Sequence, residues 1–125
     1  MQVLVDSSVW IDYFRSGDQS KPLDDLIDEN LIVINDIILA ELIPFLKIKN
    51  QTKIIRLLGV IKKLPLEIEW EEIIRFQVDC LQAGINGVGI PDLLIAQNAK
   101  QNQCHLYSLD KHFRVLNQMG IVHLF

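Results

Sequence analysis

Short runs of β-branched and aliphatic residues alternate along this chain with longer segments whose apolar residues recur at helical spacing. The runs are too short to be helices and predict strands at 2–6, 31–34, 105–109 and 121–124, with 63–66 as a short strand or an extended link. The predicted helices fall at about 8–15, 20–27, 37–47, 50–61, 70–81, 92–100 and 111–116. Such alternation favours an α/β sandwich with a mostly parallel central sheet.

The size and composition of the chain fit one folded unit. Its 125 residues fall in the usual range for one domain, and no repeat, low-complexity tract or linker divides residues 1–125. Half of the residues are hydrophobic, which favours a packed core over disorder. The first residues carry no basic signal-peptide region, and no apolar run reaches the roughly 18 residues of a membrane span. We therefore predict a cytoplasmic protein that does not enter the membrane.

Charge and cysteine content narrow the function classes. The formal net charge of −4 argues against a protein that holds nucleic acid by bulk electrostatics. It does not exclude a nuclease, because acids clustered at a metal site can account for much of the negative net charge. A bound metal ion then makes the charge at that site positive. Cys80 and Cys104 form no zinc motif, so we predict that both are buried thiols in a reducing compartment.

Three acids stand at the junctions between predicted elements. Asp6 and Asp110 each follow a predicted strand, and Asp92 opens a helix just after Pro91. Each also has an ordinary explanation, because acids near a helix N-terminus are stabilised by the helix dipole and by capping, and Ser7 or Ser8 is the expected cap of the first helix. The carboxyl ends of parallel strands share one sheet edge with the helix starts that follow, so the three acids are expected to meet there.

Glu41 is the most informative acid, because it interrupts the apolar segment 37–43. A helix that is apolar on nearly every side is predicted to be largely buried. An unpaired buried carboxylate is costly, so it protonates or acquires a partner, and a buried salt bridge is the alternative to a site role. Pro44 predicts a kink or a break in the same helix.

Together, the four carboxylates predict a metal site. If Asp6, Glu41, Asp92 and Asp110 converge without neutralisation, they repel and raise one another's pKa values. A hard divalent cation relieves this repulsion, and Mg²⁺ and Mn²⁺ prefer oxygen ligands. Such an ion can polarise a phosphate and lower the pKa of a bound water, so we predict metal-dependent phosphodiester hydrolysis.

The ordered set of motifs around these acids resembles the PIN-domain family, in particular the VapC-type ribonuclease toxins of bacterial toxin–antitoxin pairs. The matching pieces are VLVDSSVWI from Val3, AEL from Ala40, PDLLIA from Pro91 and SLDKHF from Ser108, and they span nearly the whole chain.

This resemblance implies a three-layer α/β/α sandwich and Mg²⁺- or Mn²⁺-dependent cleavage of RNA. Carried over position by position, the acidic site comprises Asp6, Glu41, Asp92 and Asp110, and the hydroxyl residues Ser8 and Ser108 support it. The resemblance also implies a homodimer and a small antitoxin that covers an apolar groove, for which the apolar helices between 37 and 61 are the candidate surface.

Basic residues close in sequence to the acids are candidate phosphate contacts. They are Arg15, Lys111, His112 and Arg114. A second basic group between Lys47 and Lys63 either flanks an RNA groove or forms a solvated helical face. Trp10, Tyr13 and Phe14 belong either to the core or to a dimer surface.

Other classes of protein compete with the nuclease. A receiver-type phosphoacceptor domain needs paired acids after the first strand, where Ser7 and Ser8 stand, and an acid after the second, where Asn35 stands. An aspartyl phosphatase needs a second acid at the position of Ser8. A non-catalytic binding module with the same fold is the other alternative, and retention of all four acids argues against it.

Overall fold

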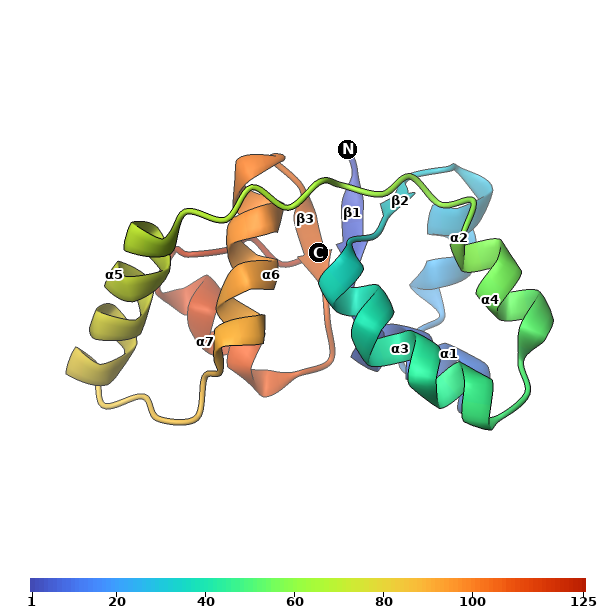
Figure 1. The fold of residues 1–125 in the computed structure, drawn as a ribbon, viewed down its shortest axis with the longest axis horizontal. Helices are drawn as coiled ribbons and strands as arrows, with labels where there is room; N and C mark the ends of the chain where they lie inside the picture. The colour runs from blue at the N-terminus through green and yellow to red at the C-terminus, as the bar shows by residue number, and fades with distance from the viewer.

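The computed structural model describes residues 1–125 and confirms the alternation of strands and helices (Figure 1). In chain order the elements are β1 (Val3–Val5), α1 (Ser7–Arg15), α2 (Pro22–Asp28), β2 (Ile32–Val33), α3 (Asp36–Ile48), α4 (Thr52–Leu58), α5 (Trp70–Gln82), α6 (Ile90–Gln101), β3 (His105–Tyr107) and α7 (Lys111–Gln118). None of these helices has both the length and the apolar character that a membrane crossing requires.

The three strands form a parallel sheet in the order β2-β1-β3. The central strand β1 is completely buried, because both of its edges are paired and helices cover both of its faces. The predicted strand at 121–124 is wrong as a full strand. Only an isolated bridge joins Leu124 to Leu106, because the turn that follows α7 occupies residues 119–121.

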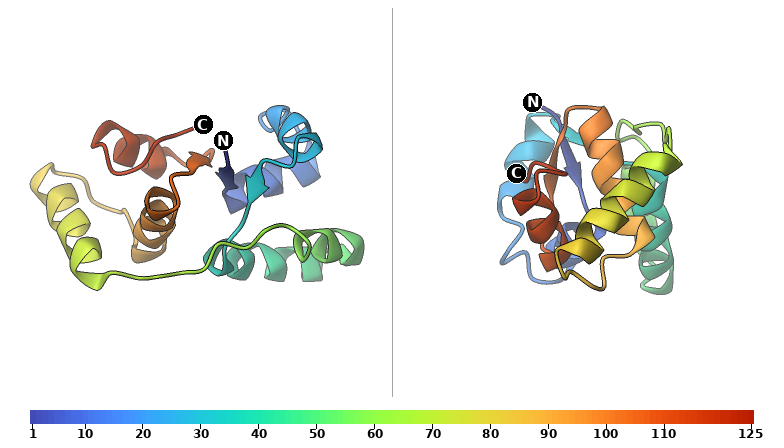
Figure 2. Two further views of the ribbon diagram at one scale, coloured as in Figure 1. Left: turned by 90° about the horizontal axis from the view of Figure 1, so that it is seen from above. Right: turned by 90° about the vertical axis from the view of Figure 1, so that its left-hand side faces the viewer.

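Helices lie on both sides of the sheet, which confirms the three-layer architecture. In Figure 2, α2 and α7 lie on one side of the strands, and α3, α4 and α6 lie on the other, with α5 packed outside α6. Helix α1 runs beside α3 below the carboxyl edge of the sheet (Figure 1). One buried hydrophobic cluster, which includes both cysteines as free thiols, joins the strands to these layers.

Helix α3 is continuous through Pro44, so the predicted break at this residue does not occur. Proline removes the bond to the carbonyl four residues earlier, here that of Ala40. Both residues are exposed, so water can satisfy the freed carbonyl. The helix begins as predicted, because the Asn35 side chain accepts a hydrogen bond from the Ile38 N–H at 2.9 Å.

Two helices expose large apolar residues to solvent. In α4, Leu58 is buried but Leu57 is 64% exposed. In α5, Ile73 and Phe76 are buried, whereas Ile74 and Val78 face outward. Each helix packs through only one face, so apolar residues on the opposite side remain in water.

The segment between α4 and α5 is an extended link that crosses the molecule (Figure 1). It pairs with the end of β2 through an isolated bridge between Ile34 and Lys63. Side chains of α6 then hold it in place. Asn98 donates to the Pro65 carbonyl at 3.0 Å, Gln101 donates to the Glu67 carbonyl at 2.8 Å, and Gln97 both donates to and accepts from the Glu69 backbone.

Candidate active site

The carboxyl edge of the parallel sheet carries the acids that the sequence singled out. Asp6 follows β1 directly and precedes α1. Asp110 lies just after β3 and immediately before α7, and Asp92 is in the first turn of α6. Glu41 is in the second turn of α3, which begins where β2 ends. Parallel topology therefore brings residues that are up to 104 positions apart in the sequence to one edge.

Two serine hydroxyls fix the orientation of the Asp6 carboxylate. Ser8 Oγ and Ser108 Oγ each donate to Asp6 Oδ2 at 2.8 Å, and Asp6 is only 4% exposed. The same hydroxyls accept from the backbone, Ser8 from the Leu109 N–H and Ser108 from the Asp110 N–H, both at 3.0 Å. Both hydroxyls bind Oδ2, which leaves Oδ1 for another partner.

Asp6 occupies the N-cap position of α1, so the expectation that Ser7 or Ser8 caps this helix is wrong. The Asp6 side chain makes no capping hydrogen bond. The hydrogen bonds from Ser8 and Ser108, and not helix capping, therefore hold this carboxylate in place.

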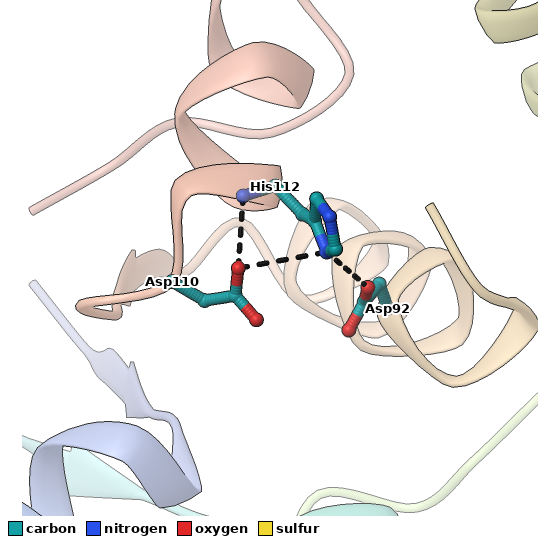
Figure 3. A group of neighbouring side chains, drawn as sticks. All are labelled: Asp92, Asp110 and His112. Atoms are coloured by element: carbon teal, nitrogen blue, oxygen red, sulfur yellow. Dashed lines mark hydrogen bonds and ion pairs between the residues drawn. The ribbon is translucent and has the colours of Figure 1, made fainter. Parts of the chain in front are cut away.

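Asp110 and Asp92 flank the His112 imidazole (Figure 3). Asp110 caps α7 by accepting from the His112 N–H at 2.9 Å, which is the ordinary role considered for it. The His112 Nδ1 atom also lies 3.3 Å from Asp92 Oδ2 and 3.5 Å from Asp110 Oδ1. These three residues offer ligand atoms that all lie within 4.8 Å of one another.

Glu41 is exposed, which corrects the prediction that it is buried. Helix α3 buries only one face, through Ile38, Leu42 and Leu46, and Glu41 lies on another. Its pKa is nevertheless raised, first by partial desolvation and then by the negative charges of Asp6 and Asp92, with a smaller contribution from Asp110 and an opposing hydrogen bond from Ser7. Each of the other three acids acts on the Glu41 carboxylate, so Glu41 lies within electrostatic reach of all of them.

The pKa of Asp92 is also raised, first by desolvation and then by the charge of Asp110. Its hydrogen bond to the Gly89 backbone and its contacts with His112 oppose this shift without cancelling it. No lysine or arginine forms an ion pair with any of the four acids, so the salt-bridge alternative for Glu41 does not hold. The cluster therefore carries negative charge that the protein itself leaves uncompensated.

This donor set fits a hard divalent cation. All four acids offer carboxylate oxygens, and their repulsion favours any ion that neutralises it. An open groove of about 440 Å³ lies beside the site, and its lining includes Ala40, Glu41, Pro91 and Leu94 from α3 and α6. An extended ligand can therefore approach the acids between these two helices.

The predicted phosphate contacts lie at different distances from the acids. Lys111 follows Asp110 directly and is exposed, and Arg114 is exposed one turn further along α7. Arg15 ends α1, about 13 Å along the helix from Asp6. Its guanidinium lies 5.4 Å from the centre of the Phe45 ring on α3, and it forms no ion pair with any of the acids.

A second concave surface lies away from the acids, between α1, α2 and α4. It encloses about 450 Å³, and all but one of its lining residues are hydrophobic. Trp10, Tyr13 and Phe14 line one wall, while Leu57 and Val60 line another. Within this wall Trp10 is buried and stacks on Phe14, so these aromatic residues serve both the core and the cleft.

Comparison with known proteins shows similarity both to a protein family and to solved structures. The profile of the PIN domain family matches residues 3–118. Among solved structures, the crystal structure of VapBC2 from Rickettsia felis bound to a DNA fragment from their promoter aligns with 100% of this chain and 98% of that chain. The TM-score is 0.77 and the sequence identity is 22%. The search among curated proteins found no significant match.

Proposed function

Because the chain belongs to the PIN-domain family, whose members are generally nucleases, we propose that it is a Mg²⁺- or Mn²⁺-dependent endoribonuclease. We further propose that it acts in the cytoplasm as the toxin of a type II toxin–antitoxin pair and inhibits growth by cleaving RNA. The observation that carries the nuclease proposal is the convergence of Asp6, Glu41, Asp92 and Asp110 without a lysine or arginine partner.

The chain's own residues divide the work of this reaction. Asp6, Asp92 and Asp110 would hold the cation, with Glu41 as a further ligand or as the group that orients water. A cation held there supplies polarisation of the scissile phosphate and a bound water of lowered pKa. Ser8 and Ser108 fix the rotation of Asp6, so that its Oδ1 faces one direction before any ligand binds. Glu41 is exposed and has a raised pKa, which suits it to accept the proton of the attacking water.

The experiment that tests this proposal is incubation of the purified protein with assorted single-stranded and structured RNAs. Cleavage is expected with Mn²⁺ or Mg²⁺ and is expected to stop on addition of EDTA. A non-catalytic binding module, the main alternative, would retard RNA or bind a partner without producing fragments under any of these conditions.

The cation is expected to stabilise the fold in a pH-dependent manner. At a free concentration of 100 times its Kd, Mn²⁺ should add about 2.7 kcal/mol to the free energy of unfolding at pH 7.5. The raised pKa values of Glu41 and Asp92 mean that protons bind more tightly to the folded than to the unfolded chain. Without a cation, their contribution to stability is present below the unfolded-state pKa and is lost as pH rises through the folded-state pKa.

Protons compete with the cation for the same oxygens, so the Mn²⁺-induced rise in Tm should shrink as pH falls from 7.5 to 5. Thermal unfolding with and without Mn²⁺ at each pH measures this difference. A rise in Tm of the same size at both pH values would mean that the ion binds elsewhere than at Glu41 and Asp92.

We assign the antitoxin to the apolar cleft between α1, α2 and α4. The cleft is large enough for two or three apolar side chains, and its lining exposes Leu57 and Val60 strongly. A partner of matching chemistry is an amphipathic helix that places apolar residues into the cleft. The chain shares its fold with the VapBC2 structure. The expected antitoxin would be a small protein with a DNA-binding N-terminal half, encoded by a short reading frame next to that of this chain.

A second copy of the chain is assigned to a different surface, the apolar stripe of α5. Trp70, Ile74, Val78 and Leu81 are all more than 44% exposed and recur at helical spacing along one side. The two surfaces lie at opposite ends of the molecule, with α4 and α5 at the right and left of Figure 1. The resemblance to homodimeric toxins supports this assignment.

Leu57→Asp is expected to weaken antitoxin binding by at least about 30-fold, because it places a charge in the apolar cleft. Leu57 is 64% exposed, so the fold should be unchanged. Ile74→Asp, at a residue on α5 that is 62% exposed, is the matched control and should instead give monomers. Calorimetric titration with the antitoxin measures its binding, and light scattering measures whether each variant is a monomer or a dimer. Loss of antitoxin binding in Ile74→Asp alone would reverse the assignment.

A further inference from the structure

We propose that His112 is a nitrogen ligand of the cation, so that the site is a mixed carboxylate–imidazole site and not a purely acidic one. This inference rests on the proposed function for the presence of the cation. It assigns to His112 a role different from the phosphate contact that its sequence position indicated.

The position of the imidazole supports this assignment. His112 Nδ1 points between the Asp92 and Asp110 carboxylates, at 3.3 and 3.5 Å, as Figure 3 shows. The three ligand atoms lie within 4.8 Å of one another, which is close to the separation of about 4.2 Å between opposite ligands of one Mg²⁺ ion. No other histidine belongs to such a group, although the chain has three.

The surroundings of His112 hold its ring in place without removing it from solvent. Its side chain is 30% exposed, and its backbone N–H is bound by the Asp110 carboxylate at 2.9 Å. The loop before α6 passes close to the far side of the ring. A Cβ atom at Gly87 would lie 3.8 Å from Nε2, and Gly87 has φ +92°, which favours glycine at this point. Asp92, Asp110 and this loop therefore define where Nδ1 points.

Nδ1 is the ring atom that faces the two carboxylates. A neutral imidazole can offer Nδ1 as a donor when its proton is on Nε2. A nitrogen donor favours Mn²⁺ over Mg²⁺, because Mg²⁺ prefers an all-oxygen shell more strongly.

Pulsed electron paramagnetic resonance of the Mn²⁺-loaded protein tests this directly, because the spectrum contains a modulation from any directly bound imidazole nitrogen. We expect that modulation in the wild type, its replacement by the ¹⁵N pattern in protein labelled with ¹⁵N-histidine, and its loss in His112→Ala. His123→Ala, at an exposed histidine outside the cluster, is the matched control and should retain it.

Calorimetric titration gives a second readout that does not depend on activity. Mn²⁺ affinity should fall about tenfold in His112→Ala, and Mg²⁺ affinity should fall less. Wild-type protein that binds Mn²⁺ without an imidazole modulation would overturn the assignment while leaving the proposed function intact. Tighter Mn²⁺ binding by His112→Ala would also overturn it, because His112 would then be a counter-ion that the cation displaces. Absence of Mn²⁺ binding in all variants would instead contradict the proposed function itself.

Discussion

Asp6→Asn is expected to lower the rate of metal-dependent RNA cleavage by about 100-fold or more, which is the scale of losing one preorganised charged group at a reacting centre. The change is isosteric, and an amide oxygen can still accept the hydroxyls of Ser8 and Ser108. What disappears is the negative charge that would hold the cation. Initial rates on a labelled RNA at fixed Mn²⁺ measure the loss, and thermal unfolding establishes that the variant is folded.

Asp25→Asn is the matched control for this substitution. Asp25 is an exposed acid in the first turn of α2, away from the acidic site and from the groove beside it. The same chemical change there should leave the cleavage rate within about twofold, because a solvated surface acid contributes little. Equal activity of wild type and Asp6→Asn in metal-defined buffer would contradict the assignment of the acids.

Asn98→Ala is expected to lower the free energy of unfolding by about 2 kcal/mol, since it leaves the buried side-chain amide of Asn35 without its hydrogen-bond partner. Asn98 is 1% exposed and lies in α6. Its Oδ1 accepts from the Asn35 side chain at 2.9 Å, and its Nδ2 donates to the Pro65 carbonyl at 3.0 Å. One side chain thus ties α6, which carries Asp92, to the start of α3, which carries Glu41. Urea denaturation measures the change.

Gln101→Ala provides the comparison for Asn98→Ala. Gln101 lies on the same helix and donates to a carbonyl of the same link, that of Glu67, at 2.8 Å, but it is exposed. Water can replace that bond, so the expected loss is below about 1 kcal/mol. If the two variants were equally stable, the buried amide pair would not be what joins the two helices.

The positions of the acids followed from topology, which explains why the sequence alone could predict them. Asp6 and Asp110 follow strands, and Asp92 starts a helix, so a parallel sheet brings them to one edge whatever the details of packing. The Ser8 and Ser108 support came from the family resemblance. In the structure this support consists of the hydrogen bonds that both hydroxyls donate to Asp6 Oδ2.

The environment of Glu41 could not be predicted from its neighbours in sequence. An apolar helix has enough hydrophobic residues to be buried on all sides, but α3 packs through Ile38, Leu42 and Leu46 and leaves Glu41 outside. Which face is covered depends on helices remote in sequence. Interactions with distant acids, not burial within its own helix, make Glu41 part of the site.

The contact of His112 with both acids was also not evident from the sequence. The available signal was its position two residues after Asp110, which places its ring near the start of α7. Its second partner, Asp92, comes from another helix, so the contact depends on how α6 packs against α7. The strand predicted at 121–124 failed for a similar reason, because only one residue of that segment reaches a pairing position on β3.

A titration of Mn²⁺ into EDTA-stripped protein, with cation occupancy and cleavage of a labelled RNA measured in the same samples, tests the central claim most directly. Cleavage should be absent without the cation and should rise in proportion to the occupied fraction of the acidic site, with Asp6→Asn inactive at every concentration. Saturation of the site without any cleavage, or full cleavage in the stripped protein, would contradict the claim that these four acids form a metal-dependent ribonuclease site.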